Sequence, residues 1–224
     1  MLAARPEFGP SLPEVVASRL RLPARRVRAV LLGGAALCAV AYLLAGLLGV
    51  RGPAELQDEL VGGPVPFTLG HSAALRRTEP QAGELLRLES RPGAPRQTYT
   101  AEPFALPAFR GDVTAVLGVL AVRQADALAR ELPGFRLRSD GKARINELPG
   151  HVVVFQARRG TRTLYGKRFL LVPLTEPGAS PPRSGVALTL LAERSPAIPN
   201  ASAVGEGSAL KAPLRSFRFG TERP

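Results

Sequence analysis

The chain has 224 residues, a formal net charge of +12 and one cysteine, Cys38. A single cysteine excludes a disulfide-stapled scaffold and a site built from several thiolate ligands. Most of the basic residues are arginines and few are lysines, a bias typical of GC-rich bacterial genomes. The charge is therefore a weak indication of nucleic acid, and no nucleic-acid partner is expected.

The first 28 residues are predicted to be a tail, partly disordered, with a short amphipathic helix in "SLPEVVASRLRL". Residues 29–50, "AVLLGGAALCAVAYLLAGLLGV", carry no charge. At about 1.5 Å per residue a helix over this run is about 33 Å long, which is enough to cross a hydrocarbon core of about 30 Å. The run predicts a transmembrane helix retained as an anchor. A signal sequence cleaved after Ala39-Val40-Ala41 is the alternative, whereas Cys38 lies too early in the run for a lipoprotein leader.

Orientation follows from the arginines that precede the apolar run, because positive charge is retained on the cytoplasmic side. The prediction is a type II single-pass protein of the cytoplasmic membrane, with the lipid bilayer as a partner and the C-terminal domain outside. Within the run, Ala41, Ala45 and Gly49 form a small-xxx-small row that another helix could pack against.

After the apolar run, 51–64 is predicted to be a linker because it is acidic and rich in Gly and Pro, and 65–224 to be the extracytoplasmic domain. Three short strands are predicted at 66–70, 85–89 and 96–104. A helix is predicted over 112–132, where apolar residues recur at three- and four-residue steps. Asp112 is its expected N-cap and Pro133-Gly134 its end.

Beyond the helix, apolar residues recur at every second position, the pattern of β-strands. One hairpin is predicted from 135–139 and 142–148 around an Asp140-Gly141 turn, and a second from 151–159 and 162–172. A further strand covers 185–193, and a weak helix or coil follows, with Phe217 and Phe219 placed under the sheet. The predicted fold class is α+β, an antiparallel sheet packed with helices behind an N-terminal transmembrane helix.

Three segments carry a resemblance to a known family: "NELPGHVVVFQARRGTRTLYGKRFLLV", the strand "GVALTLLAER" and the terminal "LRSFRF" with its Ser216-Phe217 pair. Over roughly 135–220 the chain resembles the PsbP-like superfamily. The resemblance implies an α-β-α sandwich that serves as a binding or assembly module, usually without catalysis. It implies no ligand, because a fold does not assign a function.

Enzymatic signals are sparse. The stretch "GHSAA" at 70–74 approaches a nucleophile elbow, with Ser72 as nucleophile and His151 as base, but Ala74 replaces the second glycine that the turn requires. The only two histidines, His71 and His151, lack a partner at metal-ligand spacing, so no metal is expected. No cofactor is expected either, because no glycine-rich phosphate loop occurs.

One predicted hairpin concentrates positive charge. Five cations on it form a possible patch for an anion or a protein partner: Arg158, Arg159, Arg162, Lys167 and Arg168. Strand alternation would send some of them to opposite faces of the sheet.

The function predicted from the sequence is that of a membrane-anchored, non-enzymatic binding or assembly module whose partner is a protein or an anionic envelope component. Two alternatives stay open: a serine hydrolase that uses Ser72, and a regulatory protein that acts through its cytoplasmic tail.

Overall fold

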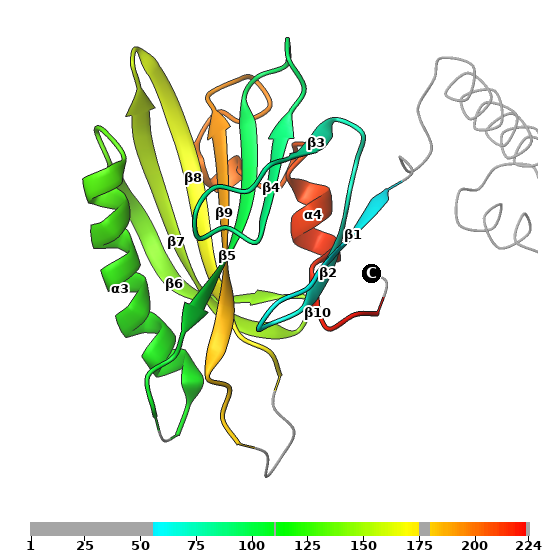
Figure 1. Cartoon of the computed structure of the whole chain (residues 1–224). Coiled ribbons are helices and arrows are strands. Elements are labelled where there is room, and N and C mark those ends of the chain that lie inside the picture. Colours follow the sequence, from blue (N-terminus) through cyan, green and yellow to red (C-terminus); the bar gives the residue numbers. More distant parts are fainter. Residues whose placement is uncertain (1–55, 110, 175–179, 223–224) are drawn as a thin grey trace, which may run out of the picture. The chain divides into compact units, whose positions relative to one another are not determined.

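The central feature of the structure, a computed structural model that describes residues 56–109, 111–174 and 180–222, is a seven-stranded antiparallel sheet (Figure 1). It belongs to one compact unit, Ala54–Pro224. The strands lie in the order β3 (Leu75–Thr78), β4 (Leu86–Ser90), β5 (Gln97–Ala105), β9 (Ser184–Glu193), β8 (Arg162–Leu171), β7 (Leu148–Arg159) and β6 (Arg136–Ile145).

One face of this sheet is partly covered by the helix α3 (Val113–Glu131), which packs against β6 and β7. The Asp112 carboxylate accepts a hydrogen bond from the Thr114 amide at 2.8 Å and so caps the helix. The buried residues of α3 recur every four or seven positions and contact the apolar side chains of β7, β8 and β9: Leu117, Ala121 and Leu128. The helix predicted over 112–132 and its N-cap are confirmed.

A second layer covers the opposite face. It consists of a three-stranded sheet, β1 (Gln57–Val61), β2 (Phe67–His71) and β10 (Arg218–Phe219), together with the short 3-10 helix η1 (Ala201–Ala203) and the helix α4 (Lys211–Ser216). Phe217 is fully buried, and its ring centroid lies 5.2 Å from that of Phe67. The Gly70 amide donates to the Ser216 hydroxyl at 2.7 Å, which fastens the C-terminal segment to β2.

The predicted fold class is wrong. The described residues form ten strands and only two α-helices, so this unit is mainly β rather than an α-β-α sandwich. The layer expected to be helical is a small sheet with α4, because 200–219 contains enough Gly, Pro and Ser to limit its α-helix to six residues. Strand β1 lies within the predicted 51–64 linker; its polar residues suit an edge strand that exposes one side to water.

The first hairpin turns at a different place from the one predicted. Strand β6 continues through Asp140 and Gly141, which pair with Val153 and Val152. The chain reverses at Asn146-Glu147, both of which have positive φ, 48° and 69°. Asn tolerates that conformation well, so a two-residue turn forms there and the Asp-Gly signal is overridden by the longer strand pairing. The second hairpin, β7 with β8, and the strand at 185–193 are confirmed.

The prediction of a single-pass membrane protein also needs correction. Across 56–109, 111–174 and 180–222, no helix combines the length and the apolar character needed to cross a bilayer. The segment 29–50, with Ala41, Ala45 and Gly49, and the tail 1–28 lie outside the described residues. The orientation and the location that were inferred from them stay predictions.

Gly118 offers a test of how α3 sits on the sheet. A Cβ atom at this position would meet the His151 Cε1 atom at 3.6 Å, an ordinary van der Waals contact. We therefore expect Gly118→Ala to raise the free energy of unfolding by about 0.5–1 kcal/mol, the usual gain of Ala over Gly inside a helix. Urea denaturation measures the change.

The control is Gly166→Ala on β8, where a Cβ atom would overlap the Phe155 ring. Overpacking of this kind costs about 1–3 kcal/mol. A loss of stability in Gly118→Ala would show that α3 lies closer to β7 than the structure places it.

Candidate functional site

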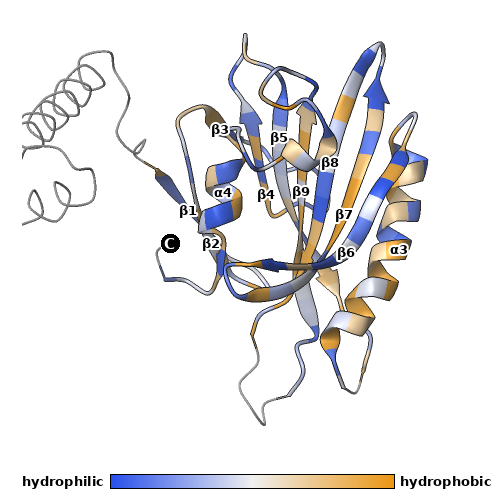
Figure 2. Cartoon of the chain, turned by 180° about the vertical axis from the view of Figure 1, so that it is seen from behind, coloured by the Kyte–Doolittle hydropathy of each residue, from blue (hydrophilic) through white to orange (hydrophobic). Residues whose placement is uncertain are grey.

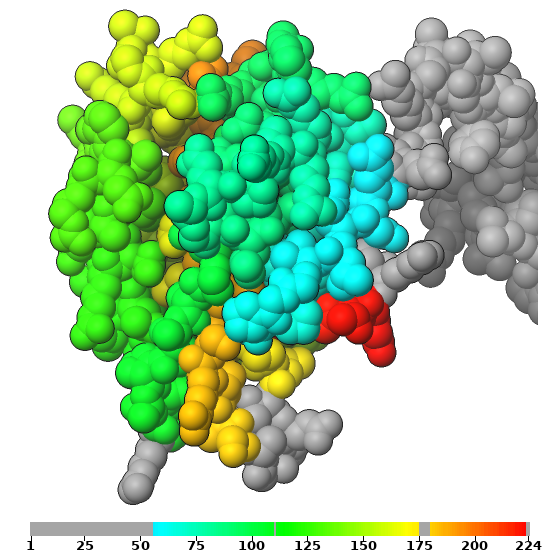
Figure 3. Space-filling model, viewed as in Figure 1, coloured from blue at the N-terminus to red at the C-terminus, as the bar shows by residue number. Residues whose placement is uncertain are grey.

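Beside α3, and on the same face of the seven-stranded sheet, lies a groove of about 530 Å³. In the space-filling view the surface is hollowed between α3 and the segment around β4 (Figure 3). We call this hollow the open-face groove. Its lining comes from β4, β5, β8 and β9, from the end of β7, from the C-terminal end of α3, and from the 81–84 loop.

Strand register explains why polar side chains gather on the floor of the groove. Thr100 pairs with Arg87 on one side and with Thr189 on the other, and Thr189 pairs with Arg168. Paired residues of an antiparallel sheet point to the same face. One row of four polar side chains therefore crosses β4, β5, β9 and β8.

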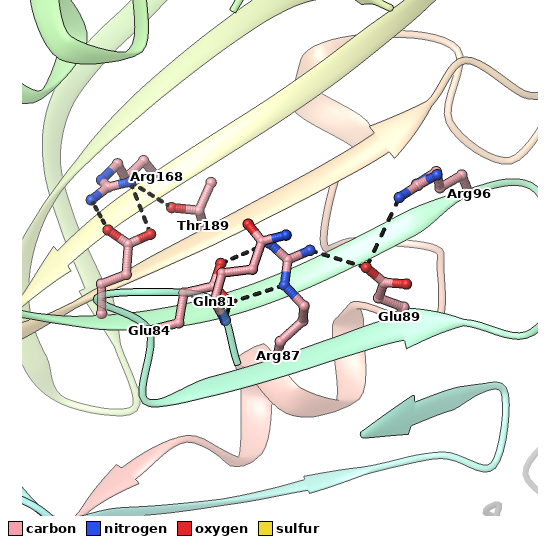
Figure 4. A network of polar contacts seen from close by, with 8 residues as sticks. Gln81, Glu84, Arg87, Glu89, Arg96, Arg168 and Thr189 are labelled. Carbon is pink, nitrogen blue, oxygen red and sulfur yellow. Dashed lines mark hydrogen bonds and ion pairs between the residues drawn. The ribbon is translucent and has the colours of Figure 1, made fainter. Parts of the chain in front are cut away.

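Arg87 is held between two carboxylates at one end of this row. It donates to Glu84 through Nη2 at 2.7 Å and through Nε at 2.9 Å, and to Glu89 through Nη1 at 3.0 Å (Figure 4). The hydrogen bonds that it donates to Glu84 raise the pKa of the Arg87 guanidinium above its usual range. Glu84 also accepts a hydrogen bond from the Gln81 backbone N–H at 2.9 Å, which joins the 81–84 loop to the same network.

Arg168 occupies the other end of the row and is 8% exposed. Its Nη2 donates to Glu102 at 2.8 Å and its Nη1 to Thr189 at 3.0 Å. Its Nε is buried and has no hydrogen-bond partner among the described residues. Burial of this guanidinium requires a carboxylate partner, because an unpaired charge that is removed from water lowers the stability of the fold.

The rim of the groove is more loosely paired than its floor. Arg96 is 47% exposed and lies 4.0 Å from Glu89 (Figure 4). Arg158 and Arg159 are exposed, and neither makes an ion pair within the described residues. The groove thus combines neutralised charges on its floor with accessible guanidinium groups on its rim.

The structure divides the five predicted cations among three places. Arg158, Arg159 and Arg168 line the open-face groove. Lys167 faces the opposite side of the sheet, where its Nζ donates to the Ser202 carbonyl at 2.8 Å. Arg162 pairs with Glu193 at 2.8 Å near the hairpin tip. The single patch predicted from the sequence is therefore not formed.

The residues that the sequence prediction missed are Arg87, Arg96, Glu102 and the threonines. A signal for part of this set exists, because Thr98, Thr100 and Glu102 alternate with the buried Tyr99 and Ala101 along β5. That alternation indicates a polar second face. Which other strands contribute to the same face depends on the strand order, which the sequence does not state.

The two elements of the hydrolase hypothesis lie on different sides of the seven-stranded sheet. Ser72 follows β2, in the layer opposite α3. The His151 ring faces α3, close to Gly118, and its Nε2 lies 3.3 Å from Asp140. His71 contacts Glu59 at 3.4 Å. Ser72 and His151 therefore do not form a nucleophile–base pair, and the described residues contain no cluster of three metal-ligating side chains.

Comparisons with known proteins assign no family. No family model matches the chain, and a search of curated proteins finds no match. A protein of unknown function from Pseudomonas aeruginosa is a similar solved structure, with 14% identity, 66% of this chain and 73% of that chain covered, and a TM-score of 0.31. Another is LpqN of Mycobacterium tuberculosis, described as involved in cell envelope biogenesis, with 14% identity, 77% and 100% covered, and a TM-score of 0.47. Neither similarity identifies a function for this chain, and the PsbP-like resemblance stays a prediction.

The pair of Arg168 and Glu102 provides a test of the groove floor. We expect Glu102→Gln to lower the free energy of unfolding by about 1–3 kcal/mol, because it leaves a buried guanidinium with a neutral partner. Urea denaturation at neutral pH measures the loss.

Glu193→Gln is the matched control, since its partner Arg162 is 70% exposed. Exposed ion pairs contribute about 0–1 kcal/mol. Equal losses in the two variants would contradict the special dependence of Arg168 on Glu102.

Proposed function

We propose that the domain is a non-enzymatic binding module and that its open-face groove holds an acidic segment of a partner protein. The observation that carries the proposal is the pair of exposed arginines, Arg158 and Arg159, at the rim of a groove whose floor already binds carboxylates. The proposal replaces the five-cation patch predicted from the sequence with a different set of residues.

The chemistry of the groove favours carboxylates. Arg87 binds Glu84 through two nitrogens, and Arg168 contacts both oxygens of Glu102. Two-point contacts of this kind are the preferred geometry between guanidinium and carboxylate. Carboxylates on a partner would form the same kind of pair with the arginines of the rim, Arg158, Arg159 and Arg96.

The length of the groove favours a segment of chain over a small anion. From Arg96, next to β5, to Arg158 on β7 the groove crosses three inter-strand steps. At about 4.8 Å per step this distance is about 14 Å, which corresponds to about four residues of extended chain. One phosphate or one carboxylate cannot contact both ends.

The side chains of the groove support binding rather than catalysis. Each of Glu84, Glu89 and Glu102 already accepts hydrogen bonds from an arginine. The oxygens of these three carboxylates are therefore already engaged by guanidinium groups. Among the described residues that line the groove there is neither His nor Cys.

A fluorescein-labelled octaglutamate peptide provides the test, with fluorescence anisotropy as the measurement. We expect binding that weakens with salt, because the contacts are electrostatic. The double variant Arg158→Met/Arg159→Met is expected to weaken binding about tenfold, since two exposed charge contacts contribute on the order of 1–2 kcal/mol together.

The control is Arg123→Met/Arg218→Met, which removes the same charge from two exposed residues outside the groove. Equal weakening by both double variants would mean general charge attraction, and no binding of the peptide to the unaltered protein would refute the proposed function.

A further inference from the structure

The face of the seven-stranded sheet opposite the open-face groove carries a second hollow, a cleft of about 520 Å³. It lies between the β6–β7 hairpin, β8 and the C-terminal segment with η1 and α4. Viewed from behind, α4 lies next to β2, in the layer that covers this face (Figure 2). The Asn146 side-chain amide donates to the Arg215 carbonyl at 2.6 Å and to the Phe217 carbonyl at 2.9 Å, which joins the two walls at one end.

The floor of this cleft is apolar, and strand register again explains why. Val152 pairs with Phe169, and Val154 pairs with Lys167, so these four side chains point into the cleft together. Ile145 and Leu214 add apolar surface from the two walls. Lys167 is therefore a cation surrounded mainly by hydrocarbon.

The Lys167 ammonium is only partly satisfied. Its side chain is 11% exposed, and its Nζ donates to the Ser202 carbonyl at 2.8 Å. The nearest carboxylate among the described residues, Glu206, lies 3.8 Å away, beyond hydrogen-bond distance. An ammonium has three protons to donate, and burial lowers the pKa of Lys167 below its usual range. A nearby anion would accept a further hydrogen bond from the ammonium and would stabilise its charged form.

Glu206 is a weak internal counter-ion. It lies 3.8 Å from Lys167 and 3.8 Å from Arg215, and its side chain is 58% exposed. A carboxylate at the surface and at that distance contributes little. An external carboxylate could approach both cations more closely and displace it.

We propose that this cleft binds a small amphipathic carboxylate, with its hydrocarbon part on Val152, Val154 and Phe169 and its carboxylate between Lys167 and Arg215. The cleft volume lies within the range of about 300–1,000 Å³ that small-molecule sites occupy. The combination of an apolar floor with few, convergent polar groups is also typical of such sites. The cleft and the open-face groove use different residues on opposite faces of the sheet, so either can be correct without the other.

The probe is octanoate, compared with octan-1-ol, which has no charge, and acetate, which has almost no hydrocarbon. Titration calorimetry of the whole chain is expected to show binding of octanoate at least tenfold tighter than of either comparison compound. Equal binding of octanol would overturn the assigned role of Lys167. Equal binding of acetate would overturn the role of the apolar floor.

Three variants, one of them a control, test whether binding occurs in the cleft. Lys167→Met is expected to reduce octanoate affinity at least tenfold, whereas Lys211→Met, which removes the same charge from an exposed position, leaves it unchanged. Glu206→Gln, a surface change that keeps the fold, is expected to raise octanoate affinity several-fold because it removes the competing carboxylate. Loss of affinity in Glu206→Gln, or no change in Lys167→Met, would refute the proposal.

Lysine side-chain NMR adds a readout that a purely structural role would not move. The chain has only three lysines, Lys142, Lys167 and Lys211, so their labelled side-chain signals are readily assigned. Octanoate is expected to raise the pKa of Lys167, since a nearby carboxylate stabilises the charged form. A titration of Lys167 that is the same with and without saturating octanoate would contradict contact between the two charges.

Discussion

The pairing of β8 between β7 and β9 is the constraint on which both candidate sites depend. Because side chains alternate along a strand, the adjacent residues Lys167 and Arg168 point to opposite faces of the seven-stranded sheet. Each is buried; Lys167 donates to Ser202 in the covering C-terminal segment, whereas Arg168 donates to Glu102 and Thr189 on β5 and β9 of the same sheet. A shift of β8 by one residue would exchange the two faces, placing Lys167 in the groove and Phe169 against its polar floor.

Each face of the sheet is only partly covered by the layer packed against it, and a hollow remains on the uncovered part of each face. Helix α3 packs against β6 and β7, and the polar row on β4, β5, β9 and β8 lines the groove beside it. On the other face, the C-terminal segment packs through Phe217 against β2 and leaves the end near the β6–β7 hairpin less filled. The same layers that bury the two apolar clusters therefore define where ligands can approach.

The two sites differ in how their charges are compensated. In the groove the buried guanidinium of Arg168 has the Glu102 carboxylate within hydrogen-bond distance. The charge on the floor is therefore neutralised within the domain, and only the arginines of the rim are available to bind a partner. In the cleft the buried ammonium of Lys167 has a carbonyl but, among the described residues, no carboxylate within hydrogen-bond distance. Burial of a charge is tolerated in proteins where it is paired, and this difference makes the cleft the place where a ligand's own charge matters most.

Local patterns in the sequence determined the helix at 113–131, its Asp112 cap, the β7–β8 hairpin and the strand at 184–193, because periodicity and capping act over a few neighbouring residues. They also determined that Lys167 and Arg168 must separate, since alternation is a property of any strand. The tertiary structure alone decided the strand order that joins Arg87, Thr100, Thr189 and Arg168 in one row, the turn at Asn146-Glu147, and the second sheet in place of a helical layer. These features arise from contacts between segments far apart in the chain, and no local pattern records which distant segment will be the partner.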